Sequence, residues 1–566
     1  MTPFINSFFK ENKTALFSFL IFGCICGGIA RYEFAWWDAA NYHYYNPWAF
    51  LNDRLNIDVV PAVINSFFSP FVDFPYYFLV NALNEHPVIF CIVMSIPYGL
   101  MLFFTYKIAT LFFSNDTTQG QIRIGLTVLL GICSENVFFQ ICSSSNEHLL
   151  SFLILASLYS LLKEIKTRRY SVKYFVFSAF ILGAAAGLKL TYAPYAAATG
   201  IALIVFHKHL NIPFKNILYF SLAGIAGFLV SYGYWGWVLW KNFQNPFFPF
   251  FNSVFPSLEW QGTDYKDIRY FNKPWFVLVF YPFLLFFNLK NSIPLTNGTI
   301  IFSNLRLVVG VAIFLGTFIK IICFSKHSEE KNKNTSLLHF LMFWMTIVYI
   351  FWIIIFRVYR YMIPFELLLS IVLVDFIFKN RKINSNDKRL LFFISFLGVV
   401  IAAVSSNYGL FFTYPYNTPL LPKKQLPLPE DTLLVIRKIP GAILVPLLAK
   451  NSTVRAIVDP DIKRKFNGSD FHRTGFFAEK AKSLLEKQKN EKKPIAYLTY
   501  RNAGSLCSPL EVFGSLFSLC WETDYFIFKP STPINIWLDK TDFLRQNKEK
   551  LEKGNKYART SGPFAR

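Results

Sequence analysis

Charged residues are scarce in this chain of 566 residues, and their scarcity restricts the class of protein. Asp, Glu, Lys and Arg make up 16% of the sequence, whereas soluble domains carry about 25%. Hydrophobic residues make up 54%, aromatic residues 19%, and the mean hydropathy is +0.36. The apolar residues fall in blocks long enough to cross a hydrocarbon core of about 30 Å, which takes about 20 helical residues. The sequence therefore predicts an α-helical polytopic membrane protein.

Short motifs of soluble enzymes are absent as well. The sequence has no Gly-rich phosphate loop, no CxxC pair, no HExxH and no GxSxG. Nucleotide hydrolysis and a structural zinc site are therefore not expected. There is also no internal repeat of the kind that many transporters show as repeated halves.

Cysteine is infrequent, with eight residues. Six of them lie in or beside apolar segments, where we expect them to pack as small hydrophobic side chains. Cys507 and Cys520 lie in the polar tail. These two are able to form a disulfide if the tail faces an oxidising compartment.

Acidic residues are fewer than basic ones, 34 against 57, which gives a formal net charge of +23. The basic residues cluster in short loops at 163–173, 207–216, 325–334 and 379–389. With the amino terminus inside, all of these loops fall on the cytoplasmic side, as the positive-inside rule predicts. A nucleic-acid partner is not expected, because it would require a basic face with interleaved aromatics on a soluble domain.

Hydropathy and charge together predict about eleven membrane spans. We expect them near residues 15–31, 88–113, 124–141, 148–162, 174–189, 192–206, 217–236, 306–324, 336–356, 361–378 and 390–408. An odd number of spans places the carboxyl end outside. The first span is expected to stay uncleaved, because no small-residue cleavage site follows it. An aromatic, Pro-interrupted piece at 275–289 could be a further span, but it would move the 325–334 charges outside.

The predicted organisation is a transmembrane domain at 1–410, a Pro-rich linker at 411–430 and an extracytoplasmic α/β domain at 431–566. The transmembrane domain has long outer loops at 32–87 and 237–305. In the first loop, the stretches "YHYYNPWAFLNDR" and "PYYFLVNAL" are typical of helices that lie on the membrane surface. In the tail, short β-rich runs such as "TLLVIRK", "TVRAIVD", "KPIAYLTY" and "DYFIFKP" alternate with helical stretches such as "FFAEKAKSLLEKQKN".

Ionisable residues at the outer ends of spans are costly and are therefore candidates for function. Asp38 comes where the first span ends, at the head of an amphipathic stretch. It is either a helix cap, favoured there by the helix dipole, or a general base for an acceptor hydroxyl. His43 could orient it or bind substrate, and Asp58 in the same loop is a further candidate for substrate binding.

Further candidates lie at three other outer positions. Glu147, in "SSSNEHLL", is either a polar helix start or a substrate-binding residue. Lys189, in "GLKLTYAPY", and Arg357 and Arg360, in "FRVYRYMIP", are outer-face cations against the positive-inside bias, and Tyr361 stands beside the last of them. Snorkelling would explain such cations. We favour a phosphate site instead, because arginine suits bidentate binding of oxygen atoms.

The ordered stretches "WWDAANYHYYNPWAFLNDR", "GLKLTYAPY", "WKNFQNPFFPFFNSVF" and "YRYMIPFELLLS" resemble the GT-C superfamily of membrane glycosyltransferases. Within it, the resemblance is to polyprenyl-phosphate-sugar-dependent enzymes related to the protein mannosyltransferase and aminoarabinose transferase type. It covers the membrane part, and the tail matches only as a terminal outer domain. The resemblance implies that Asp38 is the catalytic acid of the first outer loop and that Lys189, Arg357 and Arg360 hold a lipid phosphate. Many members have two acids close together in that loop, whereas Ala39 and Ala40 follow Asp38 here, so dependence on a divalent metal stays open.

The resemblance predicts an inverting glycosyltransferase at the outer face of a bacterial-type inner membrane. Its donor would be a polyprenyl-phosphate-linked sugar, and its acceptor a hydroxyl of a glycan, lipid or protein. Two alternatives share many of these features. A transporter or flippase of lipid-linked sugars would need no base, and a glycan polymerase or ligase would use similar chemistry. No other cofactor is expected.

Overall fold

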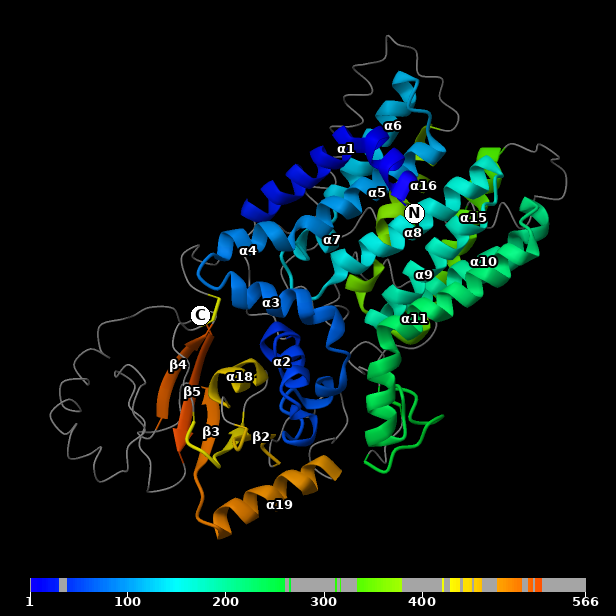
Figure 1. Cartoon of the computed structure of the whole chain (residues 1–566). Coiled ribbons are helices and arrows are strands. Elements are labelled where there is room, and N and C mark those ends of the chain that lie inside the picture. The colour runs from blue at the N-terminus through cyan, green and yellow to red at the C-terminus, as the bar shows by residue number, and fades with distance from the viewer. Residues whose placement is uncertain are drawn as a thin grey trace. The chain divides into compact units, whose positions relative to one another are not determined.

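The computed structural model describes residues 2–29, 38–259, 264–265, 311–312, 316, 333–378, 420–421, 428–437, 441–449, 452–460, 476–500, 507–512 and 515–521. The chain divides into two compact units (Figure 1). The first, called the helical unit, comprises Met1–Tyr32, Val88–Val238 and Lys266–Tyr416. The second, called the mixed unit, comprises Glu33–Pro87, Leu239–Tyr265 and Asn417–Arg566. The mixed unit therefore draws on both outer loops and the tail.

Helices, most of them long and apolar, make up most of the described part of the helical unit. They are α1 (Thr2–Ile29), α4 (Pro87–Met94), α5 (Ile96–Phe112), α6 (Thr118–Ile132), α7 (Glu135–Phe139), α8 (Glu147–Thr167), α9 (Val172–Leu188), α10 (Ala193–Leu210), α11 (Phe214–Phe243), α15 (Lys333–Ile355) and α16 (Ile363–Phe378). Two short 3₁₀ segments, η5 (Leu190–Tyr192) and η8 (Tyr359–Met362), lead into α10 and α16. Both of these segments carry residues of the candidate site.

Among the described residues, seven helical segments are long and apolar enough to cross a membrane. They are Asn12–Ile29, Pro87–Phe112, Glu147–Thr167, Leu190–Leu210, Phe214–Phe243, Ser336–Ile355 and Tyr359–Phe378. Each coincides with a span predicted from the sequence, so the prediction of a helical polytopic architecture is confirmed. The predicted span 174–189 corresponds to the shorter helix α9. The predicted spans 306–324 and 390–408 and the piece 275–289 lie almost wholly outside the described residues.

The predicted span 124–141 forms two helices rather than one. Helix α6 ends at Ile132, and the side chain of Ser134 then caps α7 by accepting a hydrogen bond from the backbone N–H of Val137. Serine competes for backbone hydrogen bonds and therefore favours a new helix start over continuation. Helix α7 ends at Phe139, and a polar loop then leads to Glu147 at the start of α8.

Helix α8 is the centre of the helical unit and packs against α5, α9 and α16. The hydroxyl groups of Ser157 on α8 and Ser178 on α9 lie 2.7 Å apart. Helix α9 also approaches α11 closely, because a Cβ atom at Gly183 would lie 1.9 Å from the carbonyl oxygen of Gly224. Small residues permit such close packing in membrane helices. The start of α8 is therefore held in a tightly packed bundle.

The mixed unit combines short helices of the first outer loop with a sheet from the tail. The loop forms a π-helical turn η1 (Ala39–His43), α2 (Tyr45–Leu51), η2 (Arg54–Asn56), η3 (Val63–Phe67), η4 (Phe71–Asp73) and α3 (Phe74–Ala82). Helix α2 falls within the first stretch predicted as a helix, and α3 begins one residue before the second and covers most of it.

The tail contributes a sheet that has five strands among the described residues, in the order β2-β1-β3-β5-β4. The strands are β1 (Leu433–Ile436), β2 (Arg455–Val458), β3 (Ile495–Tyr500), β4 (Cys507–Val512) and β5 (Ser515–Trp521). The helices of the tail are α18 (Val445–Leu448) and α19 (Phe476–Asn490). Strand β1 is parallel to β2 and β3, whereas β5 is antiparallel to β3 and β4. The predicted α/β character of the tail is confirmed, and the predicted strand "DYFIFKP" lies outside the described residues.

The first outer loop extends this sheet at the edge of β2. The backbone N–H of Val59 donates to the carbonyl of Ala456 at 2.8 Å, and that of Val458 donates to the carbonyl of Val59 at 3.3 Å. Beside this bridge, Arg54 donates to the carbonyl of Val454. Unpaired edge strands invite association with other chains. The loop therefore covers an edge that the tail would otherwise expose.

Candidate functional site

The carboxylate of Glu147 is the centre of a buried ion cluster in the helical unit. Glu147 is the first residue of α8, and Asn146 before it adopts the left-handed conformation with φ 61°. A carboxylate in the first turn of a helix is stabilised by the helix dipole. The side chain of Glu147 is 0% exposed. A charge buried to this extent requires partners.

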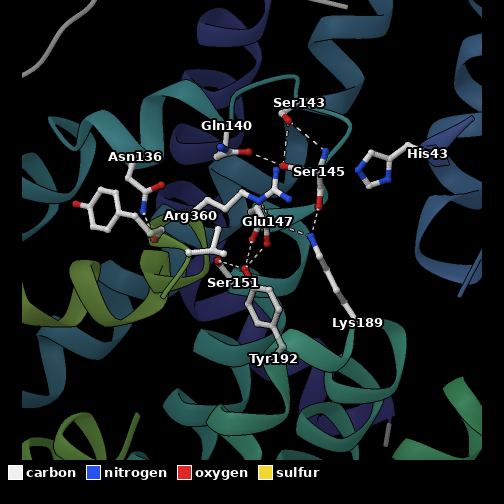
Figure 2. A network of polar contacts seen from close by, with 12 residues as sticks. His43, Asn136, Gln140, Ser143, Ser145, Glu147, Ser151, Lys189, Tyr192 and Arg360 are labelled. Atoms are coloured by element: carbon white, nitrogen blue, oxygen red, sulfur yellow. Dashed lines mark hydrogen bonds and ion pairs between the residues drawn. The ribbon is translucent and has the colours of Figure 1, made fainter. Parts of the chain in front are cut away.

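Three donors from separate segments supply those partners (Figure 2). The Nζ atom of Lys189 donates to Oε1 of Glu147 at 2.7 Å, and the hydroxyl of Tyr192 donates to Oε2 at 2.8 Å. The Nε atom of Arg360 lies 3.4 Å from Oε1 as an ion pair. Lys189 caps the end of α9, Tyr192 closes η5 and Arg360 lies in η8. One carboxylate thus fixes two cations from different parts of the chain.

The loop before α8 also holds Lys189. The Nζ atom of Lys189 donates to the carbonyl of Ser145 at 2.8 Å. The Ser145 hydroxyl in turn donates to the side chain of Gln140, and the Ser143 hydroxyl donates to the Ser145 hydroxyl at 3.0 Å (Figure 2). Chains of hydrogen bonds of this kind fix the orientation of polar groups in a low-dielectric interior. The ammonium group of Lys189 is therefore preorganised.

An aromatic ring lies next to both cations. The ring centroid of Tyr361 is 5.4 Å from Nζ of Lys189 and 5.5 Å from Cζ of Arg360. Both distances are within the range of cation–π attraction. The sequence placed Tyr361 among the substrate-binding candidates, and the structure brings it together with Glu147, Lys189 and Arg360.

A second buried acid supports the segment that carries Arg360. Glu366 of α16 is 1% exposed and accepts a hydrogen bond from the Ser134 hydroxyl at 2.7 Å. The side-chain amide of Asn136 donates to the carbonyl of Tyr359 at 3.2 Å and lies 3.4 Å from Oε2 of Glu366. These contacts tie η8 to α7. Sequence reasoning did not single out Glu366 or Tyr192, although an isolated acid in an apolar run is itself a signal.

The exposure of the cluster is asymmetric. The side chains of Lys189 and Arg360 are 14% and 13% exposed, whereas that of Glu147 is 0% exposed. Counted formally, the two cations and one carboxylate carry a net charge of +1. The carboxylate thus lies on the protein side of the cations, and the accessible part of the cluster is cationic. Such a surface is suited to an anion.

Arg357 also belongs to the helical unit, directly after α15. Its backbone is left-handed, with φ 55°, and its Nε atom donates to the carbonyl of Ile353 at 2.8 Å. A non-glycine residue in this conformation carries strain. Arg357 and Arg360 both lie on the connection between α15 and α16, three residues apart in the sequence.

The remaining predicted site residues, Asp38, His43 and Asp58, lie in the mixed unit. Asp38 is half-buried and precedes η1, whose five-residue turn ends at His43. The Nδ1 atom of His43 lies 2.6 Å from Oδ1 of Asp73, and both side chains are 2% exposed. The Nε2 atom of His43 is buried without a hydrogen-bond partner in the described part of the chain. π-Helical turns occur frequently at functional sites.

Asp58 is surrounded by donors. Arg54 donates from Nε to Oδ2 at 3.0 Å and from its terminal nitrogen to Oδ1 at 2.6 Å. The Tyr45 hydroxyl donates to Oδ2 and the backbone N–H of Ala456 to Oδ1, both at 2.8 Å. This carboxylate therefore joins the first outer loop to the sheet, a role that the spacing of residues in the sequence did not indicate.

The described residues were also compared with the groupings of side chains that bind metal ions. No group of three or more His, Cys, Asp or Glu residues among them could hold a metal ion. Glu147, Glu366, Asp58 and Asp73 have arginine, lysine, histidine, tyrosine or serine partners instead.

Comparison with known proteins identifies the fold. No family model matches the sequence, and no curated protein matches it. Among solved structures, the chain is similar to ArnT from Cupriavidus metallidurans, which was crystallised bound to undecaprenyl phosphate. The TM-score is 0.51 at 12% sequence identity, and the alignment covers 90% of this chain and 98% of the ArnT chain. The chain thus shares its fold with ArnT over most of the length of both chains.

Proposed function

We propose that this protein is a membrane glycosyltransferase that moves a sugar from a polyprenyl-phosphate carrier to an acceptor hydroxyl. The observation that carries the proposal is the convergence of Lys189 and Arg360 on the buried carboxylate of Glu147. The shared fold supports it, because ArnT binds undecaprenyl phosphate. Fold alone does not fix function. The ion cluster adds a chemical reason to expect an anionic lipid.

In this proposal the cation cluster binds the phosphate of the donor. Arg360 supplies a planar set of N–H donors and Lys189 a compact positive charge. Tyr361 lies against both. We assign no phosphate contact to Arg357, because its Nε atom already donates to the carbonyl of Ile353. The negative charge that develops on the phosphate as the sugar leaves is stabilised by fixed donors in a low-dielectric site.

Asp38 acts as the general base in the proposed reaction. It accepts the proton of the acceptor hydroxyl while the oxygen bonds to the anomeric carbon. The bond from that carbon to the phosphate oxygen breaks, and its electron pair leaves with the carrier phosphate. A direct displacement of this kind inverts the anomeric centre. No step of the proposal uses a metal ion.

His43 is proposed to bind the acceptor. In the tautomer that carries its proton on Nδ1, that atom donates to the carboxylate of Asp73 and leaves Nε2 as an acceptor. Histidines oriented in this way by a carboxylate recur in acid–base sites. We assign no substrate contact to Asp58, because its oxygens already accept from Arg54, Tyr45 and Ala456.

We place the reaction at the outer face of a bacterial-type inner membrane, with the tail domain on that side. The acceptor is a glycan, a lipid or a protein. A glycan polymerase or ligase would share this chemistry. A flippase of lipid-linked sugars would share the cation cluster but would need no base.

The test is sugar transfer by the purified full chain from a radiolabelled polyprenyl-phosphate sugar. We expect Asp38→Asn to abolish transfer while donor binding persists. The matched control is Asp53→Asn, because Asp53 is an exposed acid of the same loop. Equal rates of sugar release by wild type and Asp38→Asn would remove Asp38 as the base. Movement of intact donor across vesicles without bond cleavage would establish the flippase instead.

A further inference from the structure

The position of Glu147 behind its two cations limits how much negative charge the cluster can bind. Lys189 and Arg360 keep 14% and 13% of their side chains exposed, while both oxygens of Glu147 are engaged by donors inside the protein. Both side-chain oxygens of Glu147 accept hydrogen bonds, as the two oxygens of a negatively charged carboxylate do. The formal charge of the three groups is therefore +1 rather than +2.

The two carrier species in the proposed reaction differ in charge. The donor is a phosphodiester, which carries one negative charge. The released carrier is a phosphomonoester, which carries close to two at neutral pH because its second pKa is about 6. A purely cationic site would bind the product more tightly than the donor and would be blocked by it.

We propose that Glu147 balances the cluster for a singly charged phosphodiester and promotes release of the doubly charged carrier product. This inference rests on the proposed function and goes beyond it, because it assigns Glu147 a role in product release. The carboxylate of Glu147, which is paired with Lys189 and Arg360, repels the second negative charge of the monoester. At the effective dielectric of a partly buried site, such a repulsion changes affinity on the order of tenfold or more.

The experiment measures binding rather than turnover. The probes are farnesyl phosphate and its methyl diester, bound to the purified full chain at pH 8 and at pH 5. Glu147→Gln keeps the size of the side chain and removes its charge. At pH 8 we expect it to tighten monoester binding at least about tenfold more than diester binding. At pH 5 the monoester carries a single charge, so the two probes should respond alike.

Two variants serve as controls. Glu164→Gln changes a buried glutamate at the other end of α8, which accepts from the backbone N–H of Ser171 at 2.7 Å. It should leave both affinities unchanged. Lys189→Gln should weaken the binding of both probes.

The outcomes separate this inference from the proposed function. If Lys189→Gln weakens the binding of both probes but Glu147→Gln changes the two affinities equally at pH 8, the phosphate site stands and the role of Glu147 is wrong. If neither probe binds, or Lys189→Gln has no effect, the phosphate site itself is wrong and this inference with it. The wild type gives a check that needs no variant. A monoester affinity about a hundredfold above the diester affinity at pH 8 would also overturn the role of Glu147.

Discussion

The imidazole of His43 and the carboxylate of Asp73 form a buried pair, with Nδ1 and Oδ1 2.6 Å apart. The two residues come from different turns of the first outer loop, η1 and η4. We expect Asp73→Asn to lower sugar transfer by about tenfold to a hundredfold, because an amide can stabilise the opposite tautomer and turn Nε2 into a donor.

The measurement for this pair is the transfer rate at varied acceptor concentration, together with a thermal unfolding curve. A role in acceptor binding raises the KM for the acceptor and leaves the KM for the donor unchanged. If Asp73→Asn lowers the unfolding temperature but not the transfer rate of the folded protein, the pair is structural.

Lys189 and Arg360 should determine donor affinity. Changing either to Gln removes one charge from the phosphate site, and we expect the KM for the donor to rise at least about tenfold, since hydrogen bonds to charged groups contribute about 1.5–3 kcal/mol. The control is Lys208→Gln, an exposed lysine at the end of α10. An unchanged donor KM in both site variants would contradict phosphate binding at this cluster.

The Arg54–Asp58 pair should stabilise the mixed unit. Removing one partner of a buried ion pair costs about 3–5 kcal/mol, because the other charge is left without compensation. We therefore expect Asp58→Asn and Arg54→Met each to destabilise the unit strongly, measured by thermal unfolding and by protease sensitivity of the tail. Lys493→Gln, at an exposed ion pair, should have no measurable effect. A strong effect of Lys493→Gln with none of Asp58→Asn would contradict this assignment.

Tyr45 should make stability depend on alkaline pH. Burial, and then the charge of Asp58, raise the pKa of Tyr45 well above its usual value. Above about pH 10 an unfolded tyrosine loses its proton, while folded Tyr45 keeps it, so the folded state binds more protons. Stability should therefore fall as pH rises above that value. Unfolding temperatures between pH 8 and pH 11 should show a shallower decline for Tyr45→Phe, and parallel declines would count against this role.

Cys507 and Cys520 should form a disulfide if the tail is extracytoplasmic. They occupy partner positions in the antiparallel pair of β4 and β5, as do Pro509 and Ser518. Pro509 has no N–H, which suits a non-hydrogen-bonded position, and Cys507, two residues before it, shares that class. Cα atoms in such pairs lie about 4.5 Å apart, within disulfide range. Mass spectrometry after alkylation without reductant should find both thiols protected, and free thiols would contradict the prediction.

Hydropathy was sufficient to predict the long helices, because burial in lipid requires continuous apolar segments and the chain offers few polar residues to confuse them. It failed at 124–141, where the single hydroxyl of Ser134 starts a new helix. Strands β4 and β5 were not predicted, since a proline and a glutamate interrupt the apolar pattern of β4.

The candidate site was predictable residue by residue but not as an assembly. Glu147, Lys189, Arg360 and Tyr361 each stand out as polar groups near the end of an apolar segment. Nothing in the order of residues shows that Arg360 and Lys189 share one carboxylate, because that contact depends on how the helices pack. Asp38 and Asp58 look alike in the sequence, and only the fold reveals the four donors around Asp58.

The pairing of Val59 with β2 has a consequence for biosynthesis. Asp58 and its partner Ala456 are 398 residues apart in sequence. At about 5–20 residues per second, a ribosome needs about 20–80 s to make the intervening chain. The first outer loop therefore waits for this partner until the chain has been made as far as Ala456. A chaperone that shields that loop during the delay would be expected to affect the yield of this protein more than its activity.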